Sequence, residues 1–173
     1  MSAPATLKEG RRSAATRALV GLLVFQALGA IGGGATFLVD TSGGAAGLHT
    51  EVLARTPFDD FLWPGLLLTV GLGVPALVLA FAIVRRPQVA ALSWLERMTG
   101  QYWAWAGSVL LGVALMVWIV VQILLIESSW LQPVMFAVGA GLAALPLTAG
   151  ARRDLPTRAP GTVVPPSSGP WTL

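Results

Sequence analysis

The chain has 173 residues, of which 55% are apolar and only 11% are charged, and its mean hydropathy is +0.74. Soluble domains carry about 25% charged residues, so this composition excludes an ordinary soluble globule and an intrinsically disordered chain. The sequence has no cysteine and one histidine, His49. Disulfides, thiolate metal sites and a multi-histidine metal site within one chain are therefore excluded. The net charge of +3 takes its meaning from where the basic residues lie.

Four windows without charged residues divide the chain, and each reaches the roughly 20 residues that a helix needs to cross a bilayer. Their boundaries are Arg17 and Asp40, Asp60 and Arg85, Arg97 and Glu127, and Glu127 and Arg152. We therefore predict an all-α membrane protein, a bundle of four transmembrane helices within residues 18–151. The helices are expected at about 18–39, 58–84, 102–126 and 130–150.

The first window could instead be a cleaved signal peptide, because basic residues precede it. Its apolar stretch is longer than the usual core of a signal peptide, and no Ala-x-Ala cleavage site precedes Asp40. Both features favour a retained helix.

The basic residues predict the orientation of the helices. Ten of the eleven lysines and arginines lie in the N-terminal tail, in the 85–101 connection or in the C-terminal tail, and the other two connections hold only Arg55. Cationic loops stay on the cytoplasmic side, so we expect both termini inside the plasma membrane. Topology thus explains the basic charge, and no nucleic-acid partner is expected.

Two tails flank the predicted helices. Residues 1–17 read as a basic cytoplasmic N-terminal tail without regular structure. Residues 152–173 contain five prolines, a density that no helix or strand tolerates. We expect this segment to be a disordered cytoplasmic tail.

The connections carry signals of their own. Thr56-Pro57-Phe58-Asp59 has the features of a helix start, with Thr56 as the N-cap and Asp59 as a capping acid. In the 85–101 connection, four apolar residues recur at three-residue steps beside aromatic ones, which predicts an amphipathic helix on the membrane surface. The apolar residues are Val89, Leu92, Leu95 and Met98, and the aromatic anchors expected at the headgroup level are Trp94, Tyr102, Trp103 and Trp105.

Small residues predict how the helices pack, because helices in lipid associate mainly through close van der Waals contact. Pairs of small residues four apart occur in three of the predicted helices: Gly29 and Gly33, Ser108 and Gly112, and Ala137 and Gly141. In the second helix, Pro75 follows two glycines and predicts a kink that opens space between helices. These faces explain a compact bundle but leave open whether each one binds its own chain or another.

Polar residues near the outer boundary suggest a site. Gln122 lies one turn after Trp118, and closure of the hairpin between the third and fourth helices would bring Trp130 and Gln132 close to them. The residues of this predicted outward-facing pocket are Asp40, Asp59, Trp63, Trp118, Gln122, Glu127, Trp130 and Gln132. The alternative is that each glutamine makes one hydrogen bond between helices, which contributes about 0.6–2 kcal/mol.

Neither ion coupling nor a catalytic motif is indicated. The four windows hold no charge, whereas pumps and coupled transporters keep buried acids or bases for their task. His49, near Asp40 and Glu51, could act as a general base, but a lone loop histidine is more often only solvated. We predict no catalytic residue, no metal site and no cofactor.

Several stretches resemble a group of small four-helix integral membrane proteins of high-GC, actinobacterial-type bacteria. The resemblance rests on Gly29–Gly34, on Thr56–Gly65, and on Trp118–Gln122 followed by Trp130–Pro133, and it covers roughly residues 18–150. It implies a four-helix membrane fold and no particular activity.

Two functional hypotheses follow. The first is a non-catalytic multi-pass protein, an accessory or self-associating subunit of a membrane assembly, whose partner is another membrane protein or a second copy of the chain. The second is a binder or enzyme for a lipid or another small lipophilic molecule, which would enter the outward-facing pocket. A channel or passive transporter ranks third.

Overall fold

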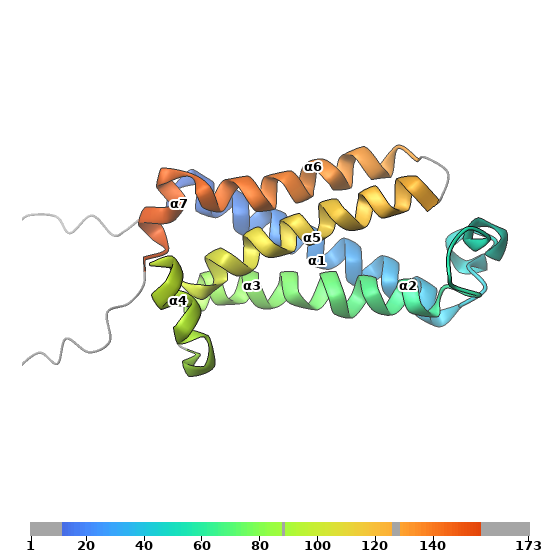
Figure 1. Ribbon diagram of the computed structural model, residues 1–173, viewed down its shortest axis with the longest axis horizontal. Coiled ribbons are helices and arrows are strands. Elements are labelled where there is room, and N and C mark those ends of the chain that lie inside the picture. Colours follow the sequence, from blue (N-terminus) through green and yellow to red (C-terminus); the bar gives the residue numbers. More distant parts are fainter. Residues whose placement is uncertain (1–11, 88, 126–128, 157–173) are drawn as a thin grey trace, which may run out of the picture.

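The computed structural model describes residues 12–87, 89–125 and 129–156, and its regular elements are helical. Long helices lie along one axis, and short helices and turns close the two ends (Figure 1). In chain order the elements are α1 (Ala14–Val39), η1 (Gly44–Ala46), η2 (Thr50–Leu53), α2 (Leu62–Leu66), η3 (Leu67–Gly73), α3 (Val74–Arg85), η4 (Ala90–Leu92), α4 (Ser93–Thr99), α5 (Trp103–Leu125), α6 (Leu131–Ala144), η5 (Leu145–Leu147) and α7 (Ala149–Asp154).

Three helices are long and apolar enough to cross a membrane: α1, the continuous helix Leu62–Arg85 formed by α2, η3 and α3, and α5. The fourth predicted helix is present as a shorter apolar helix, Leu131–Leu147. Pro146 lies in its final tight turn, after which Thr148 has an extended backbone, so this helix ends before residue 150. Helix α1 begins earlier than expected because the hydroxyl of Ser13 caps it, accepting a hydrogen bond from the Thr16 N–H at 3.2 Å.

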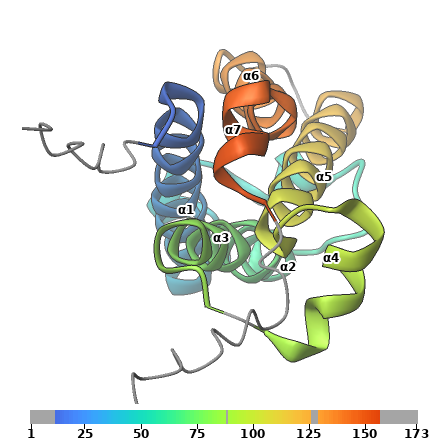
Figure 2. The same ribbon diagram turned by 90° about the vertical axis from the view of Figure 1, so that its left-hand side faces the viewer.

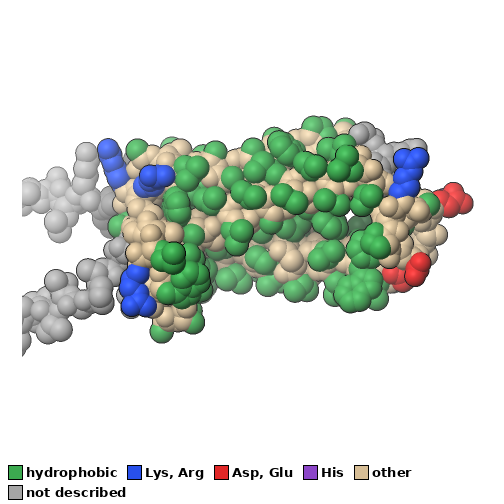
Figure 3. All heavy atoms as spheres, in the orientation of Figure 1, with side chains coloured by type: hydrophobic (Ala, Val, Ile, Leu, Met, Phe, Trp, Pro, Cys, Tyr) green, Lys and Arg blue, Asp and Glu red, His purple; other side chains and the backbone are tan. Residues whose placement is uncertain are grey.

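The long helices form a closed ring of neighbours. Helix α1 contacts α3 and α6, and α5 contacts the same two helices from the other side (Figure 2). Leucine and isoleucine side chains from three helices are completely buried at the centre: Leu19, Leu23, Ile83 and Leu142. Large apolar side chains also cover the sides of the bundle, while charged residues lie at its two ends (Figure 3). An apolar belt between two charged ends is the surface of a protein that lies in a bilayer.

The two ends differ in charge. One end, here called the arginine end, carries the start of α1 together with α4 and α7; its described arginines are Arg12, Arg17, Arg85, Arg86, Arg97, Arg152 and Arg153. The opposite end, here called the acidic end, is the loop of residues 40–61; its described charged residues are Asp40, Glu51, Arg55, Asp59 and Asp60.

The predicted start of the second helix at Thr56-Pro57-Phe58-Asp59 is wrong, because α2 begins at Leu62. The Thr56 hydroxyl instead donates to the Leu53 carbonyl at 2.9 Å, within the preceding turn. The acid that accepts a bond from the start of the helix is Asp60, whose Oδ1 lies 3.0 Å from the Leu62 N–H. Phe61, directly before the helix, is buried, so the helix begins where the chain leaves a packed side chain.

The helix accommodates Pro75 by widening the turns that precede it. The turns before it, η3, widen into a π-helix in which the Val74 N–H bonds to the Thr69 carbonyl, five residues back. A widened turn avoids the clash that a proline ring makes with the carbonyl four residues earlier. The expected gap between helices is absent at this point, because a Cβ on Gly73 would lie 2.6 Å from Cγ1 of Ile31 in α1.

Candidate functional site

Asp40 organises the turn that leads from α1 into the acidic end. Its Oδ1 accepts bonds from the Ser42 N–H at 3.0 Å and from the Ser42 hydroxyl at 2.6 Å, and its Oδ2 accepts from the Ala45 N–H at 2.9 Å. These bonds, that of the Ser42 side chain above all, hold the pKa of the Asp40 carboxyl below its ordinary value of 3.8. Asp40 is therefore ionised at neutral pH and already engaged within its own loop.

Aromatic stacking fixes the other side of the acidic end. The ring of Phe61 stacks on that of Phe37 with 4.8 Å between centroids, and the Phe61 N–H donates to the Thr41 carbonyl at 2.9 Å. Gly43 passes directly over this ring with a left-handed backbone (φ 87°), and a Cβ there would lie 2.6 Å from a ring carbon. Only glycine meets both demands at this position.

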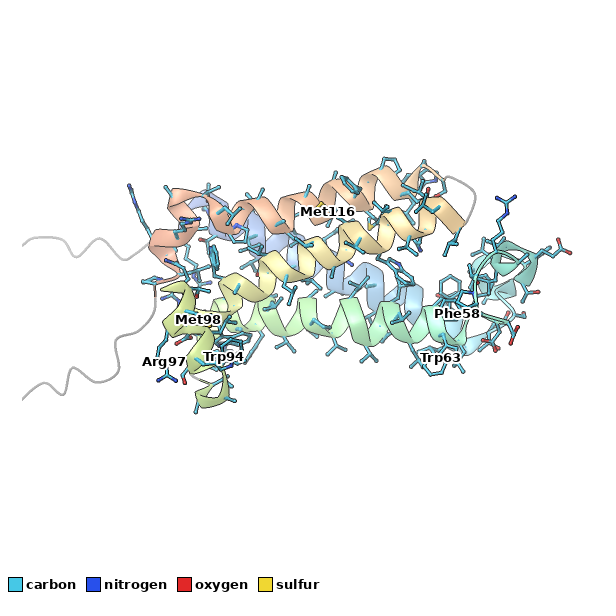
Figure 4. The ribbon with its side chains drawn as sticks, in the orientation of Figure 1. Phe58, Trp63, Trp94, Arg97, Met98 and Met116 are labelled. Carbon is cyan, nitrogen blue, oxygen red and sulfur yellow. The ribbon has the colours of Figure 1, made fainter. Side chains whose placement is uncertain are left out.

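The predicted pocket residues lie in different surroundings. Trp63 is 58% exposed and points away from the bundle (Figure 4), and Trp130 is 79% exposed at the start of the returning helix. Trp118 is half-buried and packs against the core, whereas Asp59 is exposed in the loop. Glu127 lies outside the described residues. The shared pocket stays a prediction.

The two glutamines also differ from each other. Gln132 is buried, and its Oε1 accepts a bond at 3.2 Å from the Ser129 N–H, just before its own helix. This bond reaches back from the first turn of its own helix, and no bond from the Gln132 side chain to another helix is found among the described residues. Gln122 is half-buried near the end of α5. Ser108 in α5 likewise bonds its own helix, since its hydroxyl donates to the Ala104 carbonyl at 2.8 Å.

The acidic end contains a hollow of about 430 Å³ between the loop and the end of α5. The loop side contains both charged and apolar residues, and the α5 side is apolar; the lining residues are Glu51, Val52, Ala54, Arg55, Ile123, Leu124 and Leu125. None of the seven predicted pocket residues that the structure describes is in this lining. Sequence reasoning missed the hollow because its two walls are about 70 residues apart and meet only when the loop folds back over α5. Among the described residues, no group of three or more histidines and acids is placed to hold a metal ion.

At the arginine end, a carboxylate joins the two ends of the described chain. Asp154 Oδ2 accepts from the Ser13 N–H at 2.6 Å and from the Thr16 hydroxyl at 2.8 Å. Partial burial works to raise the pKa of Asp154, but the bonds from Ser13 and Thr16 and the charge of Arg86 outweigh it and lower this pKa below 3.8. Because Asp154 and the last turn of α7 lie inside the predicted disordered tail, 152–173, the sequence pattern could not place this contact.

The aromatic residues after α4 are not the headgroup anchors that the sequence predicts. Tyr102 and Trp103 are buried in the core, at 5% and 8% exposure. Trp105 is half-buried; its indole N–H donates to the Pro146 carbonyl at 2.7 Å, and the Arg152 guanidinium lies 5.7 Å from its ring centre. Trp94 alone of the four is largely exposed. Apolar residues at a helix boundary can face either lipid or protein, and here α7 and α4 cover them.

Glycines that face other helices allow backbones to touch. A Cβ on Gly34 would lie 2.8 Å from the Gly65 carbonyl oxygen and would also meet the Thr69 hydroxyl. In the α5–α6 hairpin, a Cβ on Gly112 would lie 2.6 Å from both the Ala143 nitrogen and the Gly139 carbonyl oxygen. A Cβ on Gly141 would likewise lie 2.8 Å from Cδ1 of Leu22, while Ala137 is exposed. Of the predicted packing residues, Ser108, Gly112 and Gly141 thus lie between helices.

A second set of glycines faces away from the bundle. Exposed residues of α1 recur every three or four positions and form one strip, here called the glycine stripe: Ala18, Gly21, Phe25, Gly29 and Gly32. No atom of the described structure lies within 4 Å of a Cβ built on any of its three glycines. Gly33, predicted to pair with Gly29, faces the second helix instead: a Cβ on Gly33 would lie 4.0 Å from Cδ2 of Leu68.

Comparison of the chain with family models, with curated proteins and with solved structures found no match in any of the three. The resemblance to four-helix membrane proteins of high-GC bacteria therefore stays a prediction. The three long apolar helices establish the broader class, a helical protein with the length and composition to cross a membrane.

Proposed function

We propose that this chain is a non-catalytic multi-pass membrane protein that serves as a subunit of a membrane assembly and docks through the glycine stripe of α1. In a bilayer, lipid tails are as apolar as the helices, so small residues that let backbones approach provide the means of association. The observation that carries the proposal is the contrast between the two sets of glycines. Those facing inward contact a neighbouring helix, and the three in the stripe meet no other helix among the described residues.

The proposal includes a fourth membrane crossing and an orientation. Helix Leu131–Leu147 has 17 residues, the lower limit for a crossing, and it packs along the length of α5. The arginines gathered at one end support placing that end, with both termini, in the cytoplasm of a bacterial cell. A reporter fused before Arg17 or after Leu173 should then be active only inside the cell. Activity outside would overturn the orientation.

The absence of cysteine from the sequence permits a direct test of docking. Single cysteines at Ala18 or Gly32 would be oxidised in native membranes, with Leu110→Cys as the matched control. Leu110 is 70% exposed on α5, away from the stripe. If a second copy docks, we expect disulfide-linked dimers from the stripe positions. If the partner is a different protein, we expect a linked product of another mass after a bifunctional thiol reagent is added. Cross-linking no greater than at Leu110 would overturn the proposal.

The hollow at the acidic end supports a second candidate function, a binder of a small amphipathic lipophile. Arg55 and Glu51 could bind a polar head, while Leu124 and its neighbours contact an apolar tail. Val52→Trp should fill the hollow and abolish ligand retention in native mass spectrometry. Leu131→Trp, an equally bulky change outside the lining, should not. Retention that survives Val52→Trp would exclude the hollow as the binding site.

A further inference from the structure

Helix α4 forms a side arm that stands off the bundle at the arginine end (Figure 2). The chain leaves α3 through Arg86, whose backbone is left-handed (φ 53°), and returns through Gly100, which is also left-handed (φ 64°). The Tyr102 hydroxyl donates to the Pro87 carbonyl at 2.7 Å. This bond joins the segment that enters α5 to the segment that follows α3. The arm, residues 89–99, is therefore held in one place by its two ends.

One side of the arm packs on the protein and the other is exposed. Leu92 and Leu95 contact the core cluster, whereas Trp94 and Met98 are 53% and 77% exposed. The arm lies level with the end of the apolar belt (Figures 3 and 4), so in a bilayer these two side chains would project where acyl chains meet headgroups. Tryptophan is favoured at that depth, because its ring is apolar and its N–H is polar.

The charge beside this apolar surface is positive. Arg97 is exposed, lies one turn from Trp94 and is next to Met98 in the sequence; Arg85 is exposed at the end of α3. The two acids of the described residues at this end are already engaged. Glu96 Oε1 accepts from the Trp103 N–H at 3.3 Å, and Asp154 accepts from Ser13 and Thr16. Both acids are thus bonded to backbone or hydroxyl groups, while the guanidinium of Arg97 is exposed and accessible to an anionic group.

We propose that the arm binds anionic phospholipids of the leaflet at the arginine end. The guanidinium of Arg97 pairs with the headgroup phosphate, since its planar N–H groups match phosphate oxygens. Trp94 and Met98 lie among the upper acyl chains. The occupant is a lipid and not a soluble anion because cation and apolar surface are adjacent on one short, rigid element.

The test is native mass spectrometry of the full chain in detergent with equal amounts of phosphatidylglycerol and phosphatidylcholine. We expect a preference for phosphatidylglycerol, and Arg97→Gln should reduce the ratio of their association constants about fivefold, the effect of one arginine near a membrane surface. Arg153→Gln is the matched control, an exposed arginine at the same end but on α7. It should leave the ratio unchanged.

Two further measurements distinguish a lipid site from an effect of total charge and from a site for soluble anions. Trp94→Ala with Met98→Ser should lower retention of both lipids and leave their ratio intact, because these residues contact the chains and not the headgroup. Excess inorganic phosphate should not displace bound phosphatidylglycerol. An equal loss of preference in Arg97→Gln and Arg153→Gln would show that only total charge matters, and displacement by phosphate would show an anion site. Either result overturns the proposal, as does the absence of any preference.

Discussion

Between the two charged ends the helices touch backbone to backbone at Gly34, Gly65 and Gly112, whereas at the arginine end hydrogen bonds from polar side chains join segments far apart in the sequence. Within the described structure, Gln26 Oε1 and Thr69 Oγ1 in the long helices are buried and make no hydrogen bond, and the same holds for Gln101 Oε1 and Trp103 Nε1 near the arginine end. Close packing of backbones therefore holds the helices along the bundle, and the side-chain hydrogen bonds of Asp154 add to it at the arginine end.

The largest expected effect comes from adding one carbon atom where the backbones of α5 and α6 touch. Gly112→Ala would place a methyl group 2.6 Å from backbone atoms of α6, which cannot move without separating the hairpin. We expect a loss of about 3 kcal/mol in the free energy of unfolding, the upper range for overpacking. Gly29→Ala is the control on the outward side and should gain up to about 1 kcal/mol from helix propensity. Both are measured by unfolding in mixed detergent, and equal effects would contradict the contrast between the two glycine sets.

Removal of the carboxylate tests the arginine end. Asp154→Ala leaves the Ser13 N–H and the Thr16 hydroxyl without their acceptor, and partial exposure to water limits the cost to about 1–2 kcal/mol. Hydrogen exchange should rise in the first turn of α1 and in α7, while the α5–α6 hairpin keeps its protection. Uniform loss of protection would mean that the two regions unfold together and are not held separately.

Threonine-to-valine substitutions at the arginine end and within the bundle should change the free energy of unfolding differently. Thr16→Val removes a hydroxyl that donates to Asp154 at 2.8 Å and should cost about 1 kcal/mol. Thr69→Val removes a buried hydroxyl without a partner among the described residues, so it should be neutral or stabilise by up to about 1 kcal/mol. The shift in melting temperature of each variant measures the difference. Destabilisation by Thr69→Val would show that its hydroxyl has a partner, such as a bound water.

The smallest effect is a dependence on pH. The pKa values of Asp154 and Asp40 are lowered by folding, so each contributes stability above the ordinary aspartate pKa. That contribution is lost as the pH falls through the lowered values in the folded protein. We expect stability to be level near neutral pH and to fall below about pH 3.9. Asp154→Asn should flatten part of this decline and Asp40→Asn a further part, whereas Gly29→Ala should leave it unchanged.

Charge and hydropathy along the chain predicted the class of protein well, because a bilayer imposes strict demands on local composition. The helix expected at 102–126 is observed at Trp103–Leu125, and the one expected at 58–84 ends at Arg85. Boundaries set by chain packing were predicted less well. Helix α2 begins directly after Phe61, whose ring stacks on Phe37 of α1, a contact between residues far apart in the sequence.

The sequence by itself determined which segments are apolar, how long they are and at which end the arginines gather, since these properties belong to single stretches of chain. Only the tertiary structure decided which side of α1 faces the protein, so that Gly34 lies against Gly65 while Gly29 lies on the outside. It also decided that Tyr102 and Trp103 are buried and that Trp94 is exposed. The reason is physical: in a helix that is apolar on all sides, lipid and protein are equally good surroundings for a side chain, and the fit between neighbouring helices makes the choice.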